Sequence, residues 1–369
     1  MPRLPIPPAA LFAPLMALAT AGCGLADVPG APPTRVEETF VTRAAYFSNL
    51  DSPVVWHGPI DQDWLITTAK SPNRLYVHDA ATGELLGRVG GGGRGPVEFR
   101  RPNGIALVDD LLLVVERDNA RVQVLRLPAF DFVMSFGEGS LRRPYGIAVL
   151  RRGPATVDVF ITDDYDPAAA AAAGPLGLGE RVKRYRLELP GSGDGAGSAT
   201  LLGSFGETAG PGRLLVVESL AVDPEARLLL VADEEAGDVK VYDVDGAFTG
   251  TVLWRDVIRH EPEGIVLYPC DGGDGYWILA DQHRVHNRFL VFDRRDFTPL
   301  GAFAGATVRN TDGLAMTQRP VGSMPAGVLY AVHADRAVGA FSWRHVAAAL
   351  GLRDDCGPAA GPLPPTRNP

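Results

Sequence analysis

The feature that most constrains the fold is a short apolar motif, x-Gly-Ile-Ala-Val, that recurs along the chain. A second apolar strand follows each copy and ends in charged or polar residues. Repeats of roughly 40 to 50 residues built from short strands are typical of β-propellers, in which each repeat forms one blade. The copies cover residues 51–56 (a looser version), 102–107, 144–149, 218–222, 262–267 and 311–316. Six copies predict an all-β fold, a six-bladed β-propeller with a short C-terminal helix.

The repeats divide the chain into four parts. We expect a signal segment at residues 1–23, a flexible tether at 24–38, the propeller at 39–352 and a disordered tail at 353–369. The segment Phe40–Phe47 is expected to be a strand that closes the ring by joining the last blade, which leaves no long unpaired edge. Trp343–Leu352 is expected to be the helix, and 167–175 and 191–199 are expected to be surface insertions.

The N-terminus has the features of an export signal. A short basic start precedes the apolar stretch Ala9–Ala21, and Ala21-Gly22-Cys23 resembles a bacterial lipobox. We therefore expect export, either as a cell-envelope lipoprotein lipidated on Cys23 or as a secreted or periplasmic protein. No other segment has about 18 uninterrupted apolar residues, so a lipid anchor would be the membrane attachment.

Charge and cysteine content narrow the partners. The formal net charge of −9 argues against nucleic acid, because phosphate backbones need a basic face. We expect a monomer. Export makes a disulfide between Cys270 and Cys356 chemically possible, and two free thiols are the alternative.

The repeat also predicts where a site lies. The first strand of each blade lines the central channel, and the second returns antiparallel to it. Residues at the start of strand one and just after strand two therefore meet at one rim. That rim contains Asp51, Lys70, Asn103, Glu116, Arg117, Tyr145, Asp163, Asp164, Glu218, Asp233, Glu234, Glu235, Glu261, Glu263, Asp281, Gln282, Asp312 and His333.

Carboxylates dominate this rim, and so many like charges raise some of their pKa values. A bound hard cation would relieve the repulsion, and Ca²⁺ takes six to eight oxygen ligands from flexible carboxylate sets. Lys70 and Arg117 stand among the carboxylates and, with Ca²⁺, would suit phosphate oxygens. The chemistry implied is metal-assisted hydrolysis of a phosphate ester, with a phosphorylated small molecule as substrate.

At these residues the chain resembles the β-propeller phytases, calcium-dependent enzymes that release phosphate from inositol hexakisphosphate. The resemblance covers about Asp51 to Leu352. It is carried by motifs in the same order as in that family: Asp51-Ser-Pro-Val-Val-Trp56, Ile66-Thr-Thr-Ala-Lys70, Arg117, Tyr145-Gly146, Glu218–Asp223, Ala232–Glu235, Glu261-Pro-Glu-Gly264, Gln282 after Tyr276, Thr311-Asp-Gly313 and Trp343–Leu352.

The rim and the resemblance together assign roles. The expected catalytic residues are Lys70, Arg117, Tyr145, Glu218, Glu234 and Glu263, and the expected substrate-binding residues are Lys70, Arg117 and Gln282. The expected Ca²⁺ ligands are Asp51, Glu218, Glu234, Glu261, Glu263 and Asp312. The chain departs from the family at Asp164-Tyr165, where the family has Lys-Glu, and at Ser71, where it has a second lysine.

Two other readings remain open. The stretch from Pro102 to Val124 is close to the NHL repeat, which would make the chain a non-catalytic propeller that binds a protein, a glycan or an envelope component. A lactonase-like propeller with one Ca²⁺ on the axis shares the fold.

Overall fold

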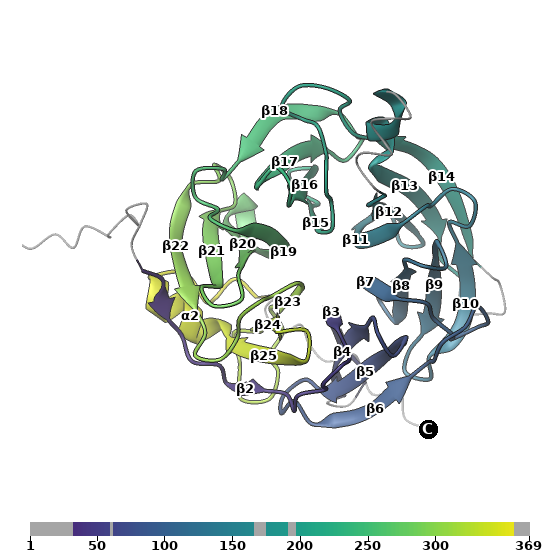
Figure 1. The fold of residues 1–369 in the computed structure, drawn as a ribbon. Helices are drawn as coiled ribbons and strands as arrows, with labels where there is room; N and C mark the ends of the chain where they lie inside the picture. The colour runs from purple at the N-terminus through teal and green to yellow at the C-terminus, as the bar shows by residue number, and fades with distance from the viewer. Residues whose placement is uncertain (1–31, 60–61, 166–174, 191–196, 358–369) are drawn as a thin grey trace, which may run out of the picture.

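The computed structural model describes residues 32–59, 62–165, 175–190 and 197–357. Within these ranges the strands form six sheets arranged as a ring around a central axis (Figure 1). The predicted six-bladed β-propeller is confirmed. The signal segment 1–23 with Cys23 lies outside the described residues, as do most of the expected insertions at 167–175 and 191–199. Among the described residues, no helix is long and apolar enough to cross a membrane.

Each of the first three blades is a four-stranded antiparallel sheet whose strands follow chain order. The first blade contains β3 (Leu50–His57), β4 (Asp63–Ala69), β5 (Arg74–Asp79) and β6 (Leu85–Val89). The second contains β7 (Pro102–Val108), β8 (Leu111–Glu116), β9 (Arg121–Arg126) and β10 (Asp131–Phe136). The third contains β11 (Pro144–Arg151), β12 (Thr156–Asp163), β13 (Val182–Glu188) and β14 (Ser198–Phe205), with a 3-10 turn η1 (Pro175–Glu180) before β13.

The remaining blades are built from the same antiparallel strands, and the fifth and sixth each gain one strand from the N-terminal segment. The fourth contains β15 (Leu220–Asp223), β16 (Leu228–Asp233), β17 (Asp238–Asp243) and β18 (Phe248–Leu253). The fifth contains β19 (Glu261–Pro269), β20 (Gly275–Gln282), β21 (Arg288–Asp293) and β22 (Pro299–Ala304), with a 3-10 turn η2 (Asp271–Gly273). The sixth contains β23 (Leu314–Thr317), β24 (Val328–His333) and β25 (Ala337–Ser342).

The N-terminal segment closes the ring. Strand β2 (Phe40–Val41) pairs antiparallel with β25, so the sixth blade combines strands from both ends of the described chain. The predicted strand Phe40–Phe47 is therefore right about its partner but too long, because the strand ends at Val41 and a turn follows at Tyr46-Phe47. Strand β1 (Thr34–Arg35) pairs in parallel with β22 of the fifth blade, although the sequence places it in the tether 24–38.

The C-terminal end packs on the fifth and sixth blades. Helix α2 (Trp343–Leu350) forms where the sequence predicts a helix, and the left-handed Gly351 (φ 69°) ends it. Trp343 is fully buried and stacks on Tyr268 of β19 at 4.3 Å between ring centroids. Cys270 and Cys356 form a disulfide. Residues 353–357, expected as the start of a disordered tail, are thereby joined to the fifth blade.

Six large apolar layers, one between each pair of adjacent blades, make up most of the core. For example, Leu65 and Tyr76 of the first blade pack with Tyr330 of the sixth. Such layers follow from strands that bury apolar side chains on both faces, which is why the second and third strands read as nearly continuous apolar runs.

The motif glycines allow these blades to approach at the axis. A Cβ atom on Gly104 would lie 2.4 Å from the carbonyl oxygen of Tyr145 in the next blade. A Cβ atom on Gly146 would lie 2.1 Å from the carbonyl oxygen of Glu218, and Gly313 faces that of Asp51 at 2.3 Å. The motif therefore carries glycine because the backbone of the next blade occupies the position of a side chain.

The substitution Gly146→Ala should lower the free energy of unfolding by about 1–3 kcal/mol, the usual cost of overpacking. Denaturant unfolding measures the change. The matched control is Gly203→Ala in β14 of the same blade, where an added Cβ meets no atom within 4 Å. Equal stability of the two variants would contradict the role assigned to the motif glycine.

Loss of the disulfide should also destabilise the fold. It closes a loop with a sequence separation of 86 residues, and removing a native disulfide typically costs about 2–5 kcal/mol. The double variant Cys270→Ser/Cys356→Ser should therefore melt at a lower temperature than the oxidised wild type. Adding reductant should lower the melting temperature of the wild type and leave that of the variant unchanged.

Candidate functional site

One residue comes from the same position in every blade, near the start of the innermost strand, and is followed by the motif glycine or, in blades one and four, by Ser52 and Ser219. We call these six residues the inner ring: Asp51, Asn103, Tyr145, Glu218, Glu263 and Asp312. All except Asn103 line a central channel together with the innermost strands. The ring follows directly from the repeat, because each motif copy contributes one member.

A carboxylate at the end of the second strand has a structural role in blades two to five; it is the last residue of β8, β12 and β16 and the next-to-last residue of β20. Glu116, Asp163, Asp233 and Asp281 are fully buried, and each accepts hydrogen bonds from backbone N–H groups ahead of the innermost strand of its own blade. Arg121, Lys240 and Arg288 form ion pairs with Glu116, Asp233 and Asp281, respectively. These four carboxylates of the predicted rim therefore hold loops in place.

The residue that follows this position in each blade makes different contacts from one blade to another. Lys70 and Gln282 contact the inner ring, whereas Asp164 accepts a hydrogen bond from the backbone N–H of Val217 at 3.2 Å. Arg117 donates to Asp118 at 2.7 Å and is not among the described residues that line the cavity at the axis. The structure thus does not bring Arg117, an expected catalytic and substrate-binding residue, into the group.

Lys70 is the buried cation of the site. Its Nζ lies 2.9 Å from Oδ1 of Asp51 and 3.6 Å from Oδ2 of Asp312. It also donates to the Tyr145 hydroxyl at 3.1 Å. Gln282 Nε2 donates to Asp312 Oδ1 on the other side of that carboxylate. Two predicted metal ligands, Asp51 and Asp312, therefore serve as partners of Lys70.

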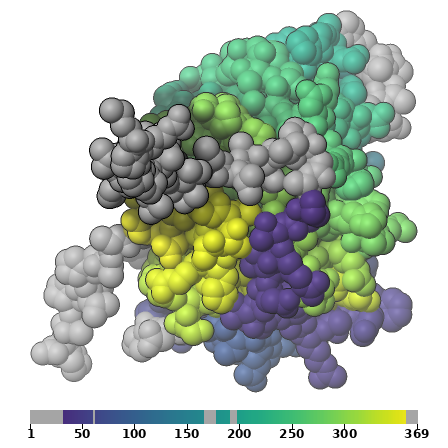
Figure 2. Space-filling view, turned by 90° about the vertical axis from the view of Figure 1, so that its left-hand side faces the viewer, coloured from purple at the N-terminus to yellow at the C-terminus, as the bar shows by residue number. Residues whose placement is uncertain are grey.

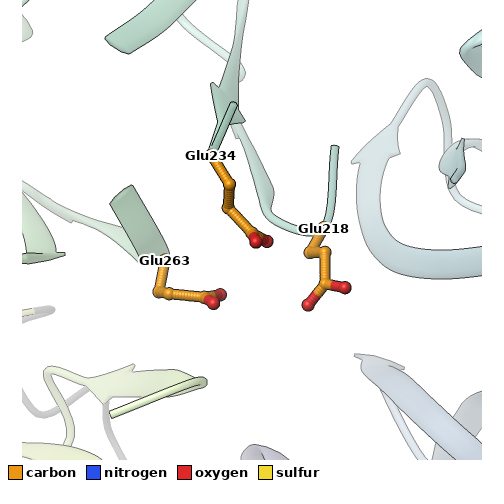
Figure 3. Close-up of side chains that lie close together, drawn as sticks. All are labelled: Glu218, Glu234 and Glu263. Atoms are coloured by element: carbon orange, nitrogen blue, oxygen red, sulfur yellow. The ribbon is translucent and has the colours of Figure 1, made fainter. Parts of the chain in front are cut away.

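Three other predicted ligands converge on one another. Ligand oxygens of Glu218, Glu234 and Glu263 all lie within 4.8 Å of one another. Figure 3 shows the three side chains, which come from different segments of the fourth and fifth blades, pointing toward a common space. We call this group the glutamate triad. Glu261, the remaining predicted ligand, is exposed and lies at the wall of the adjoining cavity.

Burial and mutual repulsion dominate the electrostatics of the triad. Burial raises the pKa of Glu218 to about 7, and the charge of Asp51 adds to the effect. Burial, with the charge of Glu218, raises the pKa of Glu234 to about 9. The pKa of Glu263 is raised well above its usual range by burial and by both other members of the triad. The metal-free site therefore retains protons at neutral pH.

The same causes act on the other members of the inner ring. Burial raises the pKa of Asp312, although Lys70 opposes the shift. Burial and the charge of Asp51 raise the pKa of the Tyr145 hydroxyl, which therefore stays protonated as a hydrogen-bond donor. For Lys70, burial lowers the pKa, but Asp51 and Asp312 outweigh it and the net shift is upward.

A cavity of about 670 Å³ opens over this group, a size typical of small-molecule sites. Its lining includes Lys70, Tyr145, Glu218, Glu261, Glu263, Gln282 and Asp312, which the sequence predicts, and His260, His283, Arg284 and Asn310, which it does not. His260 and His283 stack with 4.2 Å between ring centroids. Their position in the sequence could have revealed them, because His260 comes just before β19 and His283 just after β20. These are the positions from which the other rim residues were predicted.

The donor set fits a hard divalent cation such as Ca²⁺. Two oxygens on opposite sides of one Ca²⁺ lie about 4.6–5.2 Å apart, so the spacing within the triad permits shared ligation. Glu234 Oε1 is buried and has no hydrogen-bond partner among the described residues, and the same is true of both amide atoms of Asn103. Buried polar atoms of this kind normally have a partner, which can be an ion or water.

Comparison with known proteins adds no family. No protein-family model matches the chain, and no curated protein matches it significantly. Fold and site together define a six-bladed β-propeller with an acidic cavity at its axis.

The stability of the metal-free protein should fall as pH rises from 5 to 9. Because Glu218 and Glu234 have folded-state pKa values of about 7 and 9, above their ordinary values, the folded state holds more protons in this window. Their contribution is present at low pH and is lost as pH rises through those values. The melting temperature in EDTA measures the effect.

The variant Glu234→Gln should show a shallower fall than the wild type, since glutamine has no proton to lose. The exposed neighbour Glu235 provides the control, and Glu235→Gln should behave as the wild type does. A pH profile that is the same in all three proteins would refute the raised pKa of Glu234.

Proposed function

We propose that the protein is a calcium-dependent phosphomonoester hydrolase that releases phosphate from myo-inositol phosphates or related esters at the axial cavity. One observation carries the proposal: the glutamate triad lies beside Lys70 and Tyr145, so a cation site and two donors for phosphate oxygens adjoin one cavity. The resemblance of the motifs to those of β-propeller phytases supports the same assignment.

Glu218, Glu234 and Glu263 would hold the Ca²⁺. When bound, the ion supplies positive charge that offsets charge developing on phosphorus and helps to orient water. The three carboxylates must lose their protons to take it, so affinity should rise with pH.

Lys70 and Tyr145 would bind the phosphoryl group. The Lys70 ammonium and the Tyr145 hydroxyl are 3.1 Å apart, so both can donate to oxygens of one phosphate. Asp51 and Asp312 hold the ammonium from the other side. This fixed arrangement orients the donors before substrate arrives, which is how preorganised groups favour a transition state.

Asp312 would move the proton. Hydrolysis adds the oxygen of water to phosphorus, breaks the ester P–O bond and transfers one proton from water to the departing alcohol. Asp312 lies outside the triad, and its raised pKa favours its carboxyl group as the group that takes and returns this proton. Gln282 keeps it oriented by donating to Oδ1.

The charge of the cavity favours a substrate with few phosphates. Lys70 is its buried cation, and Arg284 at the wall is exposed. Arg117 pairs with Asp118, and Asp164 adds a carboxylate where the resembling enzymes have a lysine. A phosphate monoester with one phosphate therefore fits better than a highly phosphorylated one.

We further propose that the protein acts outside the cytoplasm. The disulfide between Cys270 and Cys356 supports this, because structural disulfides persist in oxidising compartments. The lipobox-like sequence at Cys23 supports a lipid anchor in the cell envelope.

Hydrolysis of a lactone or other carboxylic ester is a second candidate. The observation that favours it is the scarcity of cations around the triad, since Arg117 does not line the cavity. A neutral ester needs no cationic pocket beyond the metal. The two candidates differ in product, because one releases phosphate and the other releases acid that a pH-stat detects.

The substitution Glu263→Gln should lower calcium-dependent phosphate release by at least about 100-fold, the scale of losing one preorganised group at a transition state. The assay compares release from inositol phosphates and from simple monoesters, with Ca²⁺ and with EDTA. The exposed Glu235→Gln variant should keep wild-type activity. Calcium binding without turnover on any ester would reject catalysis and favour a binding propeller.

A further inference from the structure

We propose that the loop Tyr46–Asn49 and the turn Ala334–Arg336 form a second binding subsite, beside the axial cavity, that takes the ring of an aryl ester. The inference rests on the proposed function and extends it, because it names the organic part of the substrate. The subsite is a cavity of about 250 Å³, lined by Tyr46, Phe47, Asn49, Ser71, Ala334, Asp335 and Arg336.

This subsite adjoins the axial cavity through backbone and carboxylate contacts. Ser71, in its wall, follows Lys70 directly in the chain. Ala334 donates its backbone N–H to the carbonyl of Asn310, which lines the axial cavity. Asp335 is close enough to Asp312 to influence that carboxyl group. Ser71 and Asp335 thus place the subsite next to Lys70 and Asp312 of the axial cavity.

The loop is anchored on both sides. Leu50 donates its backbone N–H to Asp335 in the sixth blade, and Lys70 and Ser71 in the first blade donate theirs to Asn49 and Ser48. The Ser48 and Tyr76 hydroxyls lie 2.9 Å apart in the interior. The loop thus presents Tyr46 and Phe47 from a fixed backbone.

Phe47 has no role in packing. Its side chain is 96% exposed, the highest value among the exposed large apolar residues of the described chain, and Tyr46 is 67% exposed. The backbone of Phe47 is left-handed (φ 65°), a conformation that a bulky non-glycine residue rarely adopts. An aromatic side chain that stays in solvent on a strained, anchored loop is therefore better explained by a ligand than by folding.

The lining indicates the chemistry of that ligand. Tyr46 and Phe47 provide aromatic faces, and the Arg336 guanidinium lies over the Tyr46 ring at 5.5 Å. Asn49 and Ser71 also line the cavity and are its polar residues on the first blade. A cavity of about 150 Å³ binds benzene, so this subsite accommodates one six-membered aromatic ring. Aromatic side chains that a ligand ring can stack on, with a guanidinium nearby, favour an electron-rich aryl group.

The experiment uses phenylphosphonate and methylphosphonate, which the protein cannot hydrolyse as esters. Calorimetry in Ca²⁺ should show that Phe47→Ala weakens phenylphosphonate binding about tenfold, or about 1.4 kcal/mol, and leaves methylphosphonate affinity unchanged. Phe47→Tyr should retain the wild-type affinity. Phe132→Ala, which removes an aromatic residue 40% exposed on β10, is the control and should have no effect.

The outcomes separate this proposal from the proposed function. A selective loss in Phe47→Ala supports the subsite even if no ester releases phosphate. Equal losses for both phosphonates, or none, overturn the subsite even if phosphate release is strong. Phe47-dependent sedimentation with anionic phospholipid vesicles, without a change in phenylphosphonate affinity, also overturns it and makes the loop a membrane contact.

Discussion

The contact between each motif glycine and the carbonyl oxygen of the next blade is the constraint on which the structure depends. At Gly104, Gly146 and Gly313 the neighbouring backbone lies where a side chain would begin. The innermost strands can therefore approach the axis closely, and the residue before each glycine joins a ring. Glu218 and Glu263, which belong to different blades, meet at one point for this reason. The glycine contacts thus determine both the packing of the blades and the geometry of the site.

The inner ring gathers carboxyl groups at the buried axis of the propeller, where an ionised group costs free energy because it loses its hydration. Six apolar layers between the blades supply the stability of the fold, so the axis can tolerate carboxyl groups with raised pKa values. Shifted pKa values are common at functional sites. The surrounding fold holds the ionisable side chains of such a site together even though their like charges repel one another. Lys70 illustrates the compromise: it neutralises Asp51 and Asp312 and leaves the glutamate triad without a cation of its own.

The sequence predicts the six blades, the closing strand and the rim because a repeat fixes topology. It does not tell which rim residues turn toward the axis. Asp233 and Glu234 are adjacent carboxylates after the same strand, yet Asp233 binds backbone N–H groups and Lys240, whereas Glu234 joins the triad. Arg117 is placed correctly by register but pairs with Asp118. Such choices depend on the particular hydrogen bonds and ion pairs that each side chain makes in the folded chain, and the period of the repeat does not encode them.

The ring closure has a consequence for how the chain reaches its folded state. Residues 40–41 pair with residues 339–340, so a strand synthesised early must wait for partners synthesised almost last. The first five blades can form from local contacts as the chain emerges, but they make only an open arc. The space-filling view in Figure 2 shows the early segment, in purple, lying against the late segment, in yellow. Long-range pairing of this kind slows folding, and the complete ring can exist only after translation of the sixth blade has finished.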